Sequence, residues 1–105
     1  MKVYNKLVRD KIPEIIKNNG KKCTAKVLND DEYFLALNVK LQEELKEYLE
    51  SGETEELADM VEVIYAILDA KKVSLKEFEE IRKSKVSKRG AFKKKIFLES
   101  VDDGE

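Results

Sequence analysis

The chain has 105 residues, of which 42% are hydrophobic and 41% charged, so it can build one core under a strongly ionic surface. This length suits a single domain over residues 1–105 and excludes a two-domain arrangement. The formal net charge is −1 and histidine is absent. The near-zero net charge excludes an overall electrostatic field that attracts nucleic acid or membranes. The lack of histidine excludes imidazole bases, Ser-His-Asp triads and the usual zinc sites.

Charge is distributed unevenly along the chain. Residues 1–28 hold eight basic and two acidic side chains, residues 29–63 two and twelve, and residues 64–105 eleven and eight, which gives +6, −10 and +3. Cys23 is the only cysteine, which suits a reducing cytosol and leaves no disulfide within the chain. The first residues lack a hydrophobic signal region, and no apolar run approaches the roughly 20 residues of a spanning helix. We therefore expect a soluble, cytoplasmic protein with no membrane partner.

The first part of the chain predicts a short helix and a strand. Pro13 and Gly20 bracket a helix near residues 10–19, with Asp10 as its cap. Residues 23–28 are β-prone and too short for an independent helix, so they are predicted to form a strand.

Three further helices are predicted before a second strand. The first spans about residues 31–50, and its apolar positions follow the spacing of one buried stripe: Phe34, Leu37, Leu41, Leu45 and Tyr48. The next runs from a cap at Thr54 to about Lys72, and the last from the capping box of Ser74 and Glu77 to about Ser87 or Lys88. Residues 95–101 are predicted to pair with residues 23–28. The expected fold is mainly α, with four helices and a small two-stranded β-sheet.

Two acidic motifs lie on consecutive predicted helices. Glu44 and Glu47 are three residues apart, as are Glu56 and Asp59, so each pair projects from one side of its helix. Helices joined by a short turn are antiparallel neighbours, so the four carboxylates could converge between them. Carboxylate oxygens are hard ligands that suit Mg²⁺ or Mn²⁺, and such a site needs no histidine.

Acidic residues at helical spacing are also typical of a solvated face, and the first of the two helices leaves both interpretations open. Glu43 fits a solvated face, because it points about 180° away from Phe34. Glu56 and Asp59 fit it less well, because they share a sector with apolar residues. That sector carries Val63, Ala66 and Ile67. Carboxylates placed towards a core are costly unless they pair with cations or bind a metal, so this helix favours a metal or cation site.

The basic ends of the chain supply complementary charge. Lys6 and Arg9 lie near the start, and a second group closes the last predicted helix: Arg82, Lys83, Lys85, Lys88 and Arg89. A polyphosphate needs both a divalent cation and Lys or Arg donors. Most of these residues are equally explained as solvated lysines, but Lys85 and Arg89 stand four apart just before Gly90, where a turn can approach a ligand. The glycine motifs of P-loop and dinucleotide-binding proteins are absent.

The sequence resembles the MazG-like branch of the all-α nucleoside triphosphate pyrophosphohydrolase superfamily, a branch that includes phosphoribosyl-ATP pyrophosphohydrolase. The resemblance rests on Glu43-Glu44-x-x-Glu47 followed by Glu56-x-x-Asp59. It is supported by the opening run from Tyr4 to Pro13 and by the closing Lys85-x-x-x-Arg89-Gly90-x-Phe92, which resemble a house-cleaning subgroup. Only eight residues separate Glu47 from Glu56, fewer than in the usual MazG pattern. The hairpin is therefore tighter, which bears on pocket shape and base specificity.

This resemblance implies a four-helix, all-α pyrophosphatase-like core and Mg²⁺-dependent hydrolysis, with Mn²⁺ as a substitute, between the α and β phosphates of a nucleoside triphosphate. The products are a nucleoside monophosphate and pyrophosphate, as in nucleotide-pool sanitation. Carried over by position, the metal ligands are Glu44, Glu47, Glu56 and Asp59. The corresponding nucleotide or phosphate contacts are Asn5, Lys6, Arg9, Lys85 and Arg89. For the catalytic role we add the hypothesis that Glu47 or Glu43 assists the attacking water.

Three alternatives stay open at this point. The first is phosphoribosyl-ATP as the substrate, because the same acidic scaffold hydrolyses that compound in the resembling branch. A second is nucleic-acid binding by Lys83–Lys95, which carries seven basic residues and no acidic one but matches no recognised motif. The third is a helical oligomer without catalysis, because Leu35 and Val39 lie opposite or beside the main apolar stripe of their helix. Such faces predict a homodimer or higher homo-oligomer, with or without enzymatic activity.

Overall fold

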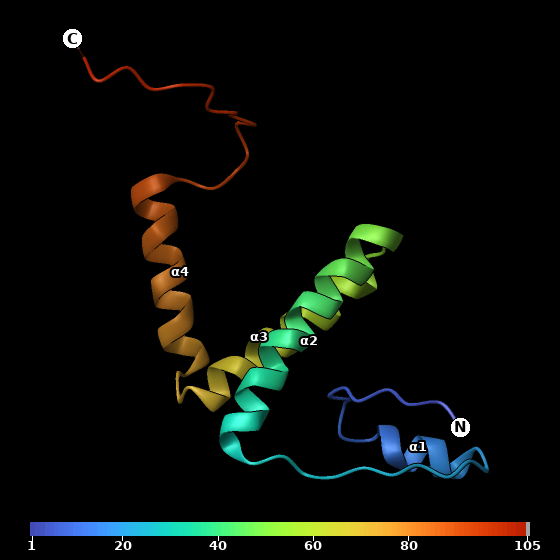
Figure 1. Ribbon diagram of the computed structural model, residues 1–105. Helices are drawn as coiled ribbons and strands as arrows, with labels where there is room; N and C mark the ends of the chain where they lie inside the picture. Colours follow the sequence, from blue (N-terminus) through green and yellow to red (C-terminus); the bar gives the residue numbers. More distant parts are fainter. Residues whose placement is uncertain (105) are drawn as a thin grey trace. The chain divides into compact units, whose positions relative to one another are not determined.

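The computed structural model describes residues 1–104, which contain four helices and no strand (Figure 1). The helices are α1 (Ile12–Asn18), α2 (Asp30–Ser51), α3 (Thr54–Ala70) and α4 (Leu75–Arg89). The prediction of a mainly helical chain is confirmed. Within this described part, no helix combines the length and the apolar character that crossing a membrane requires.

The chain divides into two compact units. The first runs from Met1 to Val73 and holds α1, α2 and α3, and the second begins at Ser74 and holds α4. The single domain over residues 1–105 stays a prediction.

The α2–α3 hairpin is fixed at both ends of α2. The side chain of Asn29 accepts a hydrogen bond from the Glu32 N–H at 2.8 Å, and the Glu32 carboxylate accepts one from the Asn29 N–H at 3.3 Å, which is a complete capping box. At the other end Gly52 has φ 69°, a left-handed conformation that a side chain would strain, and its N–H donates to the Tyr48 carbonyl at 2.7 Å. Because α3 starts two residues later, the helices must run antiparallel as neighbours.

A small core forms where α2 and α3 pack side by side (Figure 1). Leu37, Val63 and Leu68 are buried in it. The predicted stripe of α2 is only partly correct, because Leu45 is 44% exposed. The row that faces α3 instead follows i, i+4, i+7 and i+11 from Leu37, so Glu44 takes the place that the prediction gave to Leu45.

The other helix starts differ from prediction in detail. Lys11, and not Asp10, occupies the position before α1, and no side chain caps that helix. Thr54 is the first residue of α3 rather than its cap. The predicted cap of α4 is present, since the Ser74 hydroxyl accepts a hydrogen bond from the Glu77 N–H at 3.1 Å.

The predicted two-stranded sheet of residues 23–28 and 95–101 is wrong. Neither segment adopts strand structure. Val27 is 98% exposed, and the apolar run of the second segment, Ile96, Phe97 and Leu98, is 72% to 87% exposed. A β propensity reflects packing on neighbouring strands, and two short strands alone are only marginally stable. The residue types of the two segments therefore favour strands, but within the described chain the segments lack the neighbouring strands against which their side chains would pack.

Candidate functional site

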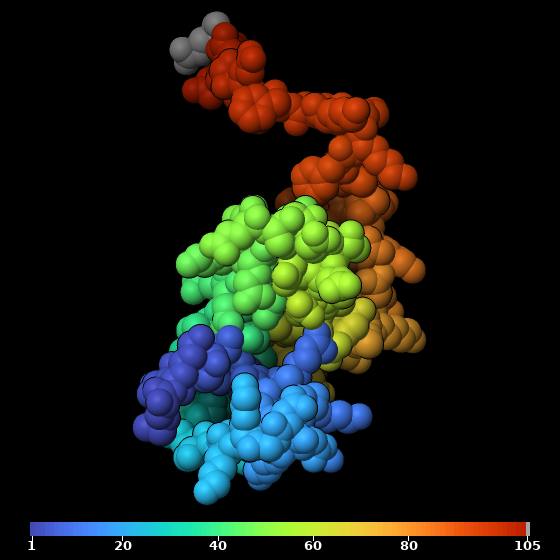
Figure 2. All heavy atoms as spheres, turned by 90° about the vertical axis from the view of Figure 1, so that its right-hand side faces the viewer, coloured from blue at the N-terminus to red at the C-terminus, as the bar shows by residue number. Residues whose placement is uncertain are grey.

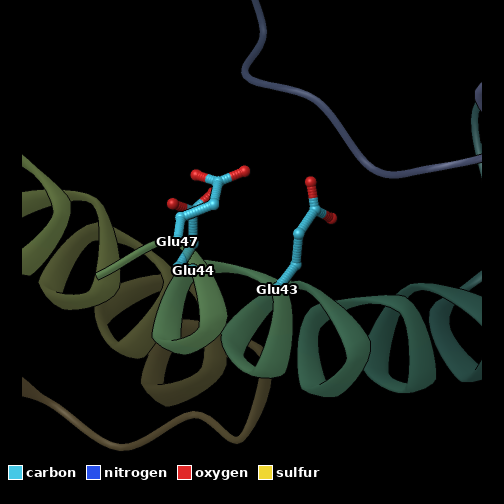
Figure 3. A group of neighbouring side chains, drawn as sticks. All are labelled: Glu43, Glu44 and Glu47. Carbon is cyan, nitrogen blue, oxygen red and sulfur yellow. The ribbon is translucent and has the colours of Figure 1, made fainter. Parts of the chain in front are cut away.

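Five carboxylates gather where α2 faces α3. Glu43, Glu44 and Glu47 each offer an oxygen atom within 4.8 Å of the others, and Figure 3 shows their side chains projecting from one side of α2. Glu44 forms a second group of the same kind with Glu56 and Asp59 of α3. We call these five residues the acidic cluster. Glu44 is the residue common to both of its groups.

The hairpin explains why these residues meet. Glu47 lies five residues before Gly52 and Glu56 four residues after it, so the two stand level on antiparallel helices. Glu44 and Asp59 also stand level, one helical turn further from Gly52. The structure therefore brings together the four residues that the sequence proposed as metal ligands.

Glu44 is the most unusual member of the cluster. The residue is only 5% exposed, and its Oε2 atom is buried without a hydrogen-bond partner among the residues described. Burial and the neighbouring charge of Glu47 raise the pKa of this carboxyl group, although Lys40 acts in the opposite direction. An unpaired buried oxygen costs about 1–3 kcal/mol, and more when it is charged. The contacts of the Glu44 side chain thus leave one of its two oxygens without a partner in the part of the chain that the structure describes.

Three basic side chains pair with the cluster. Lys6 Nζ lies 3.2 Å from Glu43 Oε1, and Arg9 Nη2 lies 2.7 Å from Asp59 Oδ1. Lys40 Nζ lies 3.3 Å from Glu43 Oε1 and 3.4 Å from Glu44 Oε1. When every group is ionised, five carboxylates against three cations leave two negative charges. That excess equals the charge of one divalent cation.

The pKa shifts follow these contacts. Burial alone would raise the pKa of Glu43, but the hydrogen bond from Lys6 and the charge of Lys40 outweigh it, so the pKa is lowered. The same hydrogen bond raises the pKa of Lys6. Desolvation and the charge of Asp59 raise the pKa of Glu56. Glu43 is therefore stabilised as a carboxylate, whereas the raised pKa values of Glu44 and Glu56 show that their charged forms are disfavoured.

The proposed phosphate contacts have different positions. Lys6 and Arg9 lie against the cluster, and Asn5 precedes Lys6 in the same segment, exposed and with φ 45°. Lys85 and Arg89 are exposed on α4, in the other unit, and their part in a site stays a prediction.

Two features of the site were not foreseen. Lys40 was overlooked, although it precedes Glu43 and Glu44 by three and four residues, the spacing of a helical ion pair. Glu43 fits a solvated face in a helical projection, although it is also a candidate base; its side chain is only 25% exposed and pairs with Lys6 from the start of the chain. A helical projection could not reveal a segment that covers the helix from outside.

A cavity of about 270 Å³ adjoins the cluster, with Glu44 and Asp59 in its lining. Its α2 wall continues through Lys40, Leu37 and Tyr33, and its α3 wall through Glu62, Val63 and Ala66. Residues 7–10 line the remaining side. Figure 2 shows the first residues of the chain (dark blue) lying against the first half of α2 (teal).

Comparisons with known proteins give one partial likeness. An uncharacterized protein of Mycolicibacterium smegmatis (strain ATCC 700084 / mc(2)155) is 46% identical over 52 residues, which are 50% of this chain and 52% of that protein. The chain thus matches about half the length of this relative. No family model matches the chain. No solved structure matches it either.

The position of Lys40 predicts a specific stability effect. Lys40→Met should lower the free energy of unfolding of the metal-free protein by about 1–3 kcal/mol, because Glu43 and Glu44 lose a partly buried counter-charge. Urea unfolding in EDTA measures the change. Lys46→Met, on the exposed side of the same helix, is the matched control. Equal stability of the two variants would contradict a role for Lys40 in the cluster.

Proposed function

We propose that this chain is a Mg²⁺-dependent nucleoside triphosphate pyrophosphohydrolase, which cleaves between the α and β phosphates and releases a nucleoside monophosphate and pyrophosphate. The observation that carries the proposal is Glu44, a carboxylate buried among four others with one oxygen unpaired within the described chain. The resemblance of the acidic motifs to MazG-like proteins supports the same reaction. The lone Cys23 fits a reducing compartment, so we place nucleotide-pool sanitation in the cytoplasm as the role.

The residues of the cluster fit Mg²⁺ or Mn²⁺. All the donors are carboxylate oxygens, which hard divalent cations prefer, and with every group ionised the cluster has two uncompensated negative charges. The residues that would hold the ion are Glu44, Glu47, Glu56 and Asp59. When bound, the ion would neutralise phosphate charge and lower the pKa of a water molecule in contact with it.

Proton transfer falls to Glu47 or Glu43, which are both half-buried in the cluster. Each could accept the proton of the attacking water. The Lys6 hydrogen bond lowers the pKa of Glu43 and so makes it a weaker base. We therefore favour Glu47 as the base and Glu43 as the residue that orients Lys6.

The basic side chains would bind the phosphates. Lys6 and Arg9 are 39% and 57% exposed, so both can turn from a carboxylate to a phosphate oxygen. Asn5, Lys85 and Arg89 are the further candidates from the sequence. Charge-assisted hydrogen bonds of this kind stabilise the negative charge that develops on the departing pyrophosphate.

We further propose that the enzyme is a homodimer or higher homo-oligomer. Leu35, Val39 and Leu49 on α2 are 61% to 72% exposed. Exposed apolar groups on one helix are typical of surfaces that associate, and soluble homo-oligomers are usually symmetric.

Pyrophosphate release tests the proposed reaction. Wild-type protein with Mg²⁺ or Mn²⁺ should release pyrophosphate from one or more compounds in a panel of canonical and modified nucleoside triphosphates and phosphoribosyl-ATP. Glu44→Gln and Asp59→Asn should each reduce release at least about 100-fold, because each removes an oxygen ligand. Glu50→Gln, exposed on α2 outside the cluster, should leave it unchanged.

The panel also separates the alternatives. Release confined to phosphoribosyl-ATP would replace the nucleotide substrate with that compound. No release from any compound by folded protein would contradict the enzyme assignment. Glu47→Gln and Glu43→Gln assayed at saturating Mg²⁺ test the base, and unchanged turnover in both would remove these two residues from that role.

Light scattering tests the oligomer. At micromolar concentration the molar mass should be at least twice the chain mass of 12.2 kDa, and Leu35→Glu with Val39→Glu should lower it. A monomeric mass for the wild type would contradict the proposal.

A further inference from the structure

The cavity beside the acidic cluster extends along the hairpin. Its α2 lining runs from Glu44 to Tyr33, which is eleven residues or about 16 Å of helix, and its α3 lining runs from Asp59 to Ala66, about 10 Å. Both walls lead away from Gly52, so the cavity begins at the cluster and continues towards the open end of the hairpin. A ligand with phosphates at the cluster would therefore place its organic part in this cavity.

The far part of the cavity suits a flat ring. Tyr33, Leu37 and Ala66 supply aromatic and aliphatic surface, and Leu7 and Val8 from the N-terminal segment face the same space. Ligand pockets of this mixed kind range from about 300 to 1,000 Å³ for drug-sized molecules. At about 270 Å³, this cavity matches a smaller group, the size of a base with its sugar.

Two exposed carboxylates lie where the ring would bind. Asp10 and Glu62 line the cavity, and within the described chain neither has an ion-pair partner, unlike Asp59, which binds Arg9. Ionised carboxylates accept hydrogen bonds and cannot donate them, so they repel phosphate oxygens and ring carbonyl oxygens. A ring amino group satisfies them, as when Glu or Asp accepts from the N4 amino group of cytosine.

We propose that this cavity holds the base of the nucleotide and selects bases with an exocyclic amino group, which Glu62 and Asp10 recognise as hydrogen-bond acceptors. The inference rests on the proposed function, because the acidic cluster must hold the phosphates. It names the substrate class as cytosine-, adenine- or guanine-type nucleotides rather than their deaminated counterparts. A site built to hydrogen-bond one group strongly rejects an analogue in which that group is replaced.

Two matched pairs of probes test this selectivity. The α,β-methylene analogues of dCTP and dUTP differ at the base in an amino group replaced by a carbonyl oxygen and in the proton that the adjacent ring nitrogen then carries. Those of dATP and dITP differ in the same way. Titration calorimetry with Mg²⁺ should give about tenfold tighter binding of the amino member of each pair, which corresponds to about 1.4 kcal/mol.

Substitutions assign the effect to the cavity. Glu62→Gln and Asp10→Asn should each reduce the binding ratio at least about threefold, and the affinity for Mn²⁺ without nucleotide should not change, because neither residue belongs to the cluster. Glu55→Gln is the matched control. It lies seven residues before Glu62 on the same face of α3, outside the cavity, and should leave the ratio unchanged.

The outcomes separate this inference from the proposed function. Equal binding of both members of each pair, or a ratio that neither variant changes, overturns the inference and leaves the pyrophosphohydrolase proposal standing. Failure of folded wild-type protein to bind any analogue, or Mn²⁺ alone, overturns both.

Discussion

The structure depends on how the α2–α3 hairpin accommodates excess negative charge. Glu44 occupies a position in the row that packs against α3, where a hydrophobic residue would ordinarily stabilise the core. Four more carboxylates surround it, and their mutual repulsion opposes the packing of the two helices. The hairpin is held instead by its capping box, by the tight turn at Gly52 and by the few buried apolar residues. A core this small cannot readily absorb uncompensated charge, and this is the physical basis on which we propose a divalent cation at the site.

The N-terminal segment and Lys40 supply part of the missing positive charge. Lys6 and Arg9 bring cations to Glu43 and Asp59 from residues 37 and 50 positions away in sequence, and residues 7–10 close one side of the cavity. The same segment therefore serves both parts of the proposed site: the cluster, where the phosphates would bind, and the cavity, where the base would bind. Because Lys6 and Arg9 are substantially exposed, they can exchange carboxylate for phosphate partners at little cost, whereas Lys40 is held between Glu43 and Glu44.

Sequence periodicity predicted the features that depend on neighbouring residues in one helix. The four helices, the Ser74 cap and the shared face of Glu56, Asp59 and Val63 follow from spacing and capping residues alone. The two strands failed because their stability depends on a partner that no local pattern specifies. The helical projection missed the partial burial of Glu43 for the same reason, since Lys6 reaches it from outside the helix. The Lys40 contacts, in contrast, follow a helical ion-pair spacing from Glu43 and Glu44 that is visible in the sequence.

The central claim is that the acidic cluster binds a divalent cation, and titration of the full chain with Mn²⁺ in the absence of nucleotide tests it most directly. The two uncompensated charges predict one bound Mn²⁺ per chain, seen as loss of the free-ion signal in electron paramagnetic resonance. Glu56→Gln should abolish this binding, and Glu53→Gln, in the turn and outside the cluster, should preserve it. Folded protein that binds no Mn²⁺, or binds it equally well in both variants, would contradict the account.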